Sequence, residues 1–204
     1  MAVKFQYNKV SMQALQKELK IRAVALPTLK SKEAYLRLTI KKEKQQRSSL
    51  QKRLEQLRAN LGENERLFAE FPEQVLHAKN VEFGQVNVAG ITVPTLDAVT
   101  IVSNQEAPVL HPIWFGWGEH IVRELARALA EIDVVNRRIA LLEHARKKTT
   151  QKVNLYEKVQ IPEFSEAVLK IKRYLEDVEN LEKAAQKITK SRKTQLELPG
   201  GMHD

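Results

Sequence analysis

Apolar side chains recur along the first third of the chain at alternating spacings of three and four residues. One heptad frame runs from residue 15 to residue 68 and is occupied mostly by leucine. A repeat sustained over so many heptads predicts a coiled-coil seam rather than a globular helix. Its apolar members are Leu15, Leu19, Leu26, Leu29, Leu36, Ile40, Leu50, Leu54, Leu57, Leu61 and Phe68. At about 1.5 Å per residue the helix would be about 80 Å long.

The last part of the chain carries a second seam with the same spacing. It begins at residue 121, and a further apolar repeat continues after Pro162. Its members are Ile121, Leu125, Ile132, Val135, Ile139, Leu142, Val153 and Tyr156. Because neither seam can stay exposed to water, each needs a partner helix. We therefore expect a mainly α fold, in which the N- and C-terminal arms form a long antiparallel two-helix coiled coil.

The two seams can be aligned by placing Phe68 opposite Ile121 at the bend. This alignment also sets Pro27 opposite Pro162. A proline inside a helix removes a backbone hydrogen bond and kinks or ends the helix. We therefore predict that both arms are interrupted at one level.

The same alignment brings together polar residues that stand at or near core positions. Glu43 falls opposite Arg146, and Arg47 and Thr149 lie within one turn. We predict a polar step in the coiled coil at this level, with a contact between Glu43 and Arg146. Chance agreement is the alternative, because the ends of the seams alone define the alignment.

The residues between the arms follow a different pattern. Partial alternation through residues 81–93, with a turn at Gly90, predicts a short β-hairpin at the bend. Pro94 is expected to end the second strand, because proline cannot donate a hydrogen bond to a sheet. Residues 97–103 are expected to add another extended piece.

Both tryptophans of the chain lie in an uncharged stretch just before the second arm. One interpretation is that this stretch covers the base of the coiled coil as its core. The other is a docking surface for a partner, since interfaces concentrate aromatic residues. The candidate docking residues, with those of the hairpin, are Val88, Gly90, Ile91, Pro94, Trp114, Phe115 and Trp117.

These patterns divide the chain into four parts. Residues 1–70 form the N-terminal coiled-coil helix, and residues 71–120 form the insert with the hairpin and the aromatic patch. Residues 121–193 form the C-terminal coiled-coil helix, interrupted near Pro162. Residues 194–204 are expected to be a flexible tail.

The net charge of +9 over 204 residues changes this picture only when it is divided. Residues 1–70 carry 16 Lys and Arg against 7 Asp and Glu, and residues 121–204 carry 17 against 13. The insert, residues 71–120, is acidic, with 1 against 5. A basic coiled coil that binds nucleic acid, or a scaffold of a secretion apparatus, is therefore an alternative function. However, acidic residues are interleaved through both arms, and no groove-reading motif occurs.

The sequence offers no pattern that predicts catalysis. It contains no cysteine, and its five histidines do not stand at metal-ligand spacings. It contains no phosphate-binding loop. We therefore expect no catalytic, cofactor-binding or metal-binding residue, and a chain that is not an enzyme. No uncharged apolar run approaches the roughly 18 residues of a membrane helix, so we expect a cytoplasmic protein without direct membrane insertion.

Three stretches match segments of a known family. Residues 26–36 resemble its Leu-Lys-x-Lys segment, residues 153–162 its Val-Asn-Ala-Leu-Glu…Ile-Pro signature, and residues 88–94 its hairpin. The matching motif residues are Lys30, Lys32, Val153, Asn154, Glu157, Ile161 and Pro162. The chain thereby resembles the D subunit, the central-stalk rotor shaft of V-type and A-type rotary ATPases. Pro27 and Glu33 depart from the usual pattern, which indicates a divergent, bacterial-type branch.

The resemblance implies a function and a set of partners. A shaft of this family sits within the hexamer of catalytic A and non-catalytic B subunits and couples ATP hydrolysis or synthesis to ion translocation. It also implies contacts with the F subunit of the central stalk and with the C/d adaptor of the rotor ring. Such a chain needs no cofactor and lies peripheral to the membrane through its complex. The alignment above also predicts that residues 29–36 face residues 153–160, so that the two motifs are partners.

Overall fold

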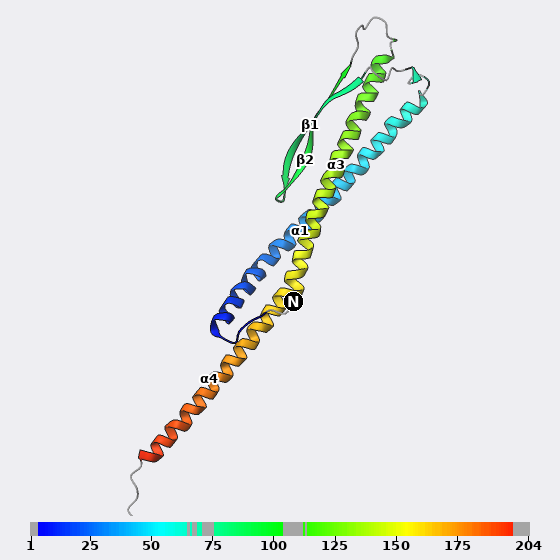
Figure 1. The fold of residues 1–204 in the computed structure, drawn as a ribbon. Helices are drawn as coiled ribbons and strands as arrows, with labels where there is room; N and C mark the ends of the chain where they lie inside the picture. Colours follow the sequence, from blue (N-terminus) through cyan, green and yellow to red (C-terminus); the bar gives the residue numbers. More distant parts are fainter. Residues whose placement is uncertain are drawn as a thin grey trace, which may run out of the picture. The chain divides into compact units, whose positions relative to one another are not determined.

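A computed structural model of the chain describes residues 4–64, 66, 69–70, 76–103, 112 and 114–197. The elements follow in the order helix α1 (Lys9–Glu63), strand β1 (Leu76–Val88), strand β2 (Ile91–Ser103), helix α3 (Phe115–Leu155), π-helical turn η2 (Tyr156–Gln160) and helix α4 (Ile161–Glu197) (Figure 1). The predicted fold class is confirmed, because long helices dominate and the two strands form one antiparallel hairpin.

The chain forms two compact units. We call residues 31–150 the hairpin unit, and residues 1–30 with 151–204 the terminal unit. Helices α1 and α3 each contribute residues to both units. None of the helices in the described part of the chain holds a stretch that is both long and apolar enough to cross a membrane.

In the hairpin unit, α1 packs antiparallel against α3. Arg53 of α1 forms an ion pair with Glu124 of α3. Farther toward the start of α1, Glu33 pairs with Arg146, which lies later in α3. The residue numbers of the partners rise along α3 as they fall along α1. The two helices therefore run in opposite directions, as predicted.

The hairpin turns at residues 88–91 and is longer than predicted. Ala89 and Gly90 have φ values of 53° and 78°, and the Gly90 amide donates to Asn87 Oδ1 at 2.8 Å. Two successive positive φ values are those of the tight turn that suits the twist of a hairpin. The expectation that Pro94 ends the second strand was wrong, because β2 continues to Ser103 and Pro94 pairs with Gln85. A strand of a two-stranded sheet has one unpaired edge, where a missing N–H costs no sheet bond.

The hairpin supplies part of the core of its unit. Val93 of β2 is fully buried against Leu36 and Ile40 of α1 and Leu142 of α3. The hairpin therefore lies along the helix pair (Figure 1). Val88 and Ile91, on either side of the turn, pack against the same cluster.

In the terminal unit, the start of α1 packs against α4. Leu15 is buried with Ala167 and Ile171 of α4. Before the helix begins, the ring of Tyr7 lies 4.9 Å from that of Tyr174. Residues 179–194 of α4 are all exposed, and in Figure 1 this end of α4 extends past the start of α1.

The two prolines affect their helices differently from the prediction. Helix α1 continues through Pro27. Before Pro162 the chain forms the π-turn η2, in which the Ile161 amide donates to the Tyr156 carbonyl, five residues back. The wider turn accommodates a residue that cannot donate to the preceding turn. The prolines do not face each other, because Gln160 bonds to Arg22, five residues before Pro27.

The predicted seam lies on the packed sides of the helices. Each of its members in the described part of the chain is buried or half-buried. Phe68 and the residues from 198 to the end, which include most of the expected tail, lie outside the described residues.

Candidate functional site: polar contacts within the helix pairs

Glu43 is the one charged side chain in the buried core of the described residues. It comes from α1, and its side chain is 8% exposed. Its Oε1 accepts a hydrogen bond of 2.7 Å from Nη2 of Arg138 on α3, whose side chain is 20% exposed. Removing either partner would leave a charge with little access to water, which is costly.

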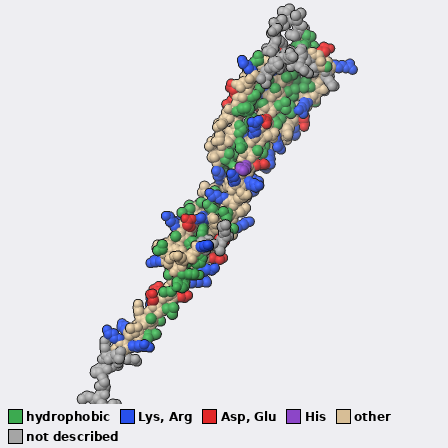
Figure 2. All heavy atoms as spheres, in the orientation of Figure 1, with side chains coloured by type: hydrophobic (Ala, Val, Ile, Leu, Met, Phe, Trp, Pro, Cys, Tyr) green, Lys and Arg blue, Asp and Glu red, His purple; other side chains and the backbone are tan. Residues whose placement is uncertain are grey.

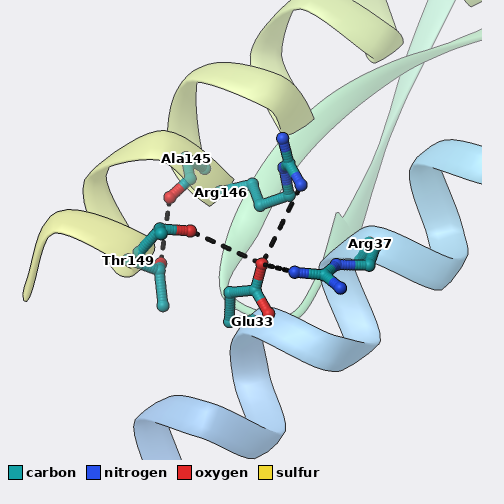
Figure 3. Close-up of polar contacts among 6 residues, drawn as sticks. Glu33, Arg37, Ala145, Arg146 and Thr149 are labelled. Carbon is teal, nitrogen blue, oxygen red and sulfur yellow. Dashed lines mark hydrogen bonds and ion pairs between the residues drawn. The ribbon is translucent and has the colours of Figure 1, made fainter. Parts of the chain in front are cut away.

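A second carboxylate, Glu33, binds α3 nearer the start of α1. Its Oε1 accepts hydrogen bonds from Arg37 of its own helix at 3.1 Å and from Thr150 at 3.5 Å. Nη1 of Arg146 lies 3.9 Å from the same oxygen (Figure 3). The Thr149 hydroxyl instead donates to the Ala145 carbonyl of its own helix. Glu33 thus connects the two helices through one oxygen atom.

Glu43 of the predicted polar step is buried, but the contact predicted for it was wrong. Glu43 contacts Arg138 rather than Arg146, and Arg146 contacts Glu33. Arg138 precedes Arg146 by two helical turns, so the observed alignment differs from the predicted one by about one heptad. A seam that repeats every seven residues looks nearly the same after a slide of seven, which explains the error. Arg138 was missed because the alignment considered only core positions of the seam, and Arg138 stands beside one of them, Ile139.

The polar groups of this level are not fully matched. Glu43 Oε2 and the Nε atoms of Arg47, Arg138 and Arg146 are buried without a hydrogen-bond partner. These atoms belong to both helices, Glu43 and Arg47 on α1 and Arg138 and Arg146 on α3, so buried polar groups of the two helices meet here.

The terminal unit has polar contacts of its own. Lys30 Nζ lies 2.5 Å from Glu157 Oε1, so the two helical segments meet at this level. Arg22 Nε donates to Gln160 Oε1 at 2.7 Å, and its guanidinium lies 4.7 Å from the centre of the Phe164 ring. Arg22 therefore binds on both sides of the residue pair Ile161–Pro162, at the end of the π-turn. Sequence reasoning missed it because a single arginine on a helix gives no local signal.

Comparison of the sequence with known proteins shows the family of the chain. A family model described as the D subunit of ATP synthase matches residues 11–191, which include both arms and the hairpin. The chain belongs to this D-subunit family. The V-type ATP synthase D subunit of Borreliella burgdorferi is 31% identical over 192 residues, covering 92% of this chain and 94% of that protein. Those of Chlamydia muridarum and Chlamydia trachomatis serovar L2 are each 27% identical over 188 residues. Each match covers 87% of this chain and 90% of the relative.

The segments that resemble the D-subunit family lie close to one another within their units. Lys30 of the first motif pairs with Glu157 of the second. Lys32 is half-buried, and a β-carbon placed on Gly90 would lie 3.8 Å from its Nζ, so this lysine reaches the hairpin turn. Among the other residues of the second motif, Val153 is buried and Ile161 half-buried, whereas Asn154 and Pro162 are exposed.

The candidate docking residues of this D-subunit chain are only partly accessible. Val88, Ile91 and Pro94 are half-buried, and Phe115 is buried. The ring of Trp114 lies 4.7 Å from that of Phe115, while Trp117 is 41% exposed. The patch therefore contributes to the core through Phe115 and also presents an aromatic surface.

The terminal unit of this D-subunit chain also carries an apolar groove. It has a volume of about 620 Å³ and lies between α1 and the end of α3 with η2. Ile21 and Val24 line it and are 52% and 67% exposed, and Lys17, Lys20 and Lys152 stand around them. Within the described residues, no three His, Asp or Glu side chains gather as they would to hold a metal ion.

Proposed function

We propose that this chain is the non-catalytic central rotor shaft of a V/A-type rotary ATPase. It couples ATP hydrolysis or synthesis in the hexamer of A and B subunits to ion translocation through the membrane ring. The observation that carries the proposal is the D-subunit family match over residues 11–191, on a chain built from paired long helices. The curated relatives are D subunits of V-type ATP synthases.

A rotating shaft must transmit torque without being held in one orientation. Two helices packed antiparallel along an apolar seam resist torsion better than a single helix, because contacts between them recur along their length. On the face shown in Figure 2, the Lys and Arg side chains are spread along the chain and interspersed with acidic ones. Exposed ion pairs contribute only about 0–1 kcal/mol each, so contacts of this kind can exchange as the shaft turns.

The proposed partners follow from the same assignment. The terminal segments of the helices lie within the head and contact the A and B subunits. The hairpin and the bend lie nearer the membrane, beside the F subunit of the central stalk and the C/d adaptor of the rotor ring. The chain itself is cytoplasmic and is held at the membrane through the complex.

The first test is reconstitution of the host's complex with and without this chain. We expect that omission leaves nucleotide hydrolysis by the head but abolishes ATP-driven ion transport into vesicles. Adding back the chain restores transport. A purified chain that associates with no component of the ATPase, or that shows a steep salt-dependent shift with DNA or RNA, would contradict the proposal.

Site-specific photo-crosslinking tests the proposed placement. A photoreactive residue at Val24, in the groove of the terminal unit, is expected to crosslink to A or B. The matched position is Val86 on β1, which is 41% exposed and should crosslink to neither. Crosslinking of Val86 but not Val24 to the head would reverse the proposed orientation while leaving the assignment as a shaft intact.

A further inference from the structure

The helix pair of the hairpin unit could pack in two ways that its apolar seam barely distinguishes. Because the seam repeats every seven residues, sliding α3 by one heptad along α1 leaves apolar positions facing one another at most levels. In the observed packing Glu43 contacts Arg138. In the slid packing it would lie opposite Arg146, which is the alignment that the ends of the seams favour. A feature other than the seam must therefore select the observed packing.

The charged residues do distinguish the two packings. In the observed packing, Glu43 forms an ion pair with Arg138. Glu33 forms one with Arg146 and accepts a hydrogen bond from Thr150. In the slid packing only Glu43 would gain a guanidinium. Glu33 would move one heptad, about 10 Å, away from its partners on α3, and Arg138 would lie opposite Gln51. One packing satisfies both carboxylates, and the other satisfies one.

We propose that Glu33 and Glu43, with Arg146 and Arg138, form a two-point register lock. The lock excludes packing of α1 against α3 one heptad away. Two points are needed because a single pair can be replaced, as Arg146 could replace Arg138 beside Glu43. The inference concerns the fold of the hairpin unit and does not depend on the proposed function.

The burial of these ion pairs suits a role in selecting the register rather than in adding stability. A buried ion pair stabilises little compared with apolar residues of the same size, and its best-attested use is to fix register. Glu43 Oε2 and the Nε atoms of Arg138 and Arg146 are buried without hydrogen-bond partners. Burying these polar atoms costs free energy in any packing. The cost is largest in a packing where the carboxylates lie far from the guanidinium groups.

The hairpin encodes the same register. Val93 is fully buried against Leu36 and Ile40 of α1 and Leu142 of α3. Sliding α3 by about 10 Å would carry Leu142 away from the other two residues and open this cluster. The ion pairs and the hairpin therefore favour one alignment.

Cysteine crosslinking can read the register directly, because the full chain contains no cysteine. Arg53 of α1 contacts Glu124 of α3 in the observed packing. Glu131 lies one heptad farther along α3 and would take the place of Glu124 after the slide. The reporters are therefore R53C/E124C for the observed register and R53C/E131C for the slid one, each treated with the same short bis-maleimide crosslinker. Both lack Arg53 and so carry the same change on α1.

The lock is broken by E33Q/E43Q, which keeps the size of both side chains and removes their charge. We expect the original chain to give the first crosslink almost exclusively. The ratio of the first to the second crosslink should fall at least about tenfold in E33Q/E43Q, since a bond to a charged group has an effect of this size. E43R/R138E, which exchanges the charges, should recover the ratio. D133N, which removes an exposed pair with Arg137 on one helix, should leave the ratio unchanged.

Three outcomes would overturn the proposal. The first is an unchanged ratio in E33Q/E43Q, which would mean that the hairpin and the seam suffice. The second is strong crosslinking of R53C/E131C in the otherwise unaltered chain. The third concerns E43R/R138E, which becomes the deciding variant if E33Q/E43Q loses its helical circular dichroism. A folded E43R/R138E chain that gives mainly the crosslink of the slid register would overturn the proposal.

Discussion

The hairpin unit and the terminal unit use the same helices but bury them differently. In the hairpin unit, buried apolar residues recur along both helices from Leu36 and Leu54 to Ile121 and Leu142, and Val93 of β2 is fully enclosed with them. Among the described residues of the terminal unit the buried apolar ones are few: Leu15, Val153, Ala167 and Ile171. The difference lies in a third element, because two helices alone leave part of each seam residue open to water.

The comparison teaches where each unit obtains its stability. The hairpin covers the groove between α1 and α3, so apolar burial is the main stabilising contribution there. In the terminal unit, polar and aromatic contacts supplement the seam, with Arg22 beside Gln160 and Phe164 and with Tyr7 against Tyr174. Substitutions in the core should therefore have larger effects in the hairpin unit than substitutions of single polar groups in the terminal unit.

The largest effect is expected from Leu142→Ala. Leu142 is 0% exposed and contacts both α1 and the hairpin. The change leaves a cavity in a three-element core, and the free energy of unfolding should fall by about 2–5 kcal/mol. The control is Leu141→Ala, because Leu141 is 44% exposed on the same helix turn. Thermal and urea unfolding followed by circular dichroism measure both. Equal losses in the two variants would show that the hairpin does not complete the core.

A smaller effect is expected from Gly84→Ala in β1. A β-carbon at Gly84 would lie 2.6 Å from Thr95 Oγ1 and would also meet the Asp97 carboxylate, so both side chains would have to leave their present positions. We expect a loss of about 1–3 kcal/mol in the free energy of unfolding. Amide hydrogen exchange of the strands would locate the loss in the hairpin.

Gly62 provides the matched control for this change. A β-carbon there meets nothing within 4 Å, and Gly62 lies within α1. Gly62→Ala should therefore stabilise the chain slightly, by up to about 1 kcal/mol. Adding Asp97→Ala to Gly84→Ala should recover part of the loss. No recovery would mean that the crowding at Asp97 is not its cause.

In the terminal unit, Arg22→Lys is expected to have a moderate effect. Lysine keeps the charge but loses the Nε donor to Gln160 and the flat group that faces Phe164. The free energy of unfolding of the terminal unit should fall by about 1–2 kcal/mol. Amide hydrogen exchange at residues 156–161 should rise, whereas Arg173→Lys, at an exposed position of α4, should change neither quantity. Unchanged exchange in Arg22→Lys would separate Arg22 from the stability of the π-turn.

The sequence predicted what depends on periodicity and missed what depends on register. The seven-residue repeat was enough to predict the two arms and to assign residues such as Leu36 and Leu142 to the packed side. It could not choose between alignments one heptad apart, so Glu43 was given the wrong arginine. Glu33 and Arg138 were not recognised as contacts, because their partners lie more than 90 residues away along the chain.

The prolines show a second limit of sequence reasoning. A proline removes one backbone donor, but the consequence depends on what surrounds it. In the hairpin, Pro94 stands on a strand with a free edge, so β2 continues. Before Pro162 the helix widens into η2, and at Pro27 helix α1 continues. Local rules therefore predicted a perturbation at three prolines, and the structure shows one, the π-turn before Pro162.

The smallest effect is expected at the exposed end of α4, where the comparison with Glu43 is most direct. Glu179 accepts a hydrogen bond from Lys183 one turn later, at 2.7 Å, and this bond, together with the lysine charge, holds the pKa of Glu179 below its ordinary value. A carboxylate with a lowered pKa contributes stability above its ordinary pKa, and the contribution is lost as the pH falls through the lowered value. Because Glu179 is fully exposed, Lys183→Gln should raise its pKa toward the ordinary value, as measured by NMR titration, without a measurable change in unfolding. A clear loss of stability in Lys183→Gln would mean that this exposed pair behaves like the buried pair of Glu43 and Arg138, and that burial is not what separates the two.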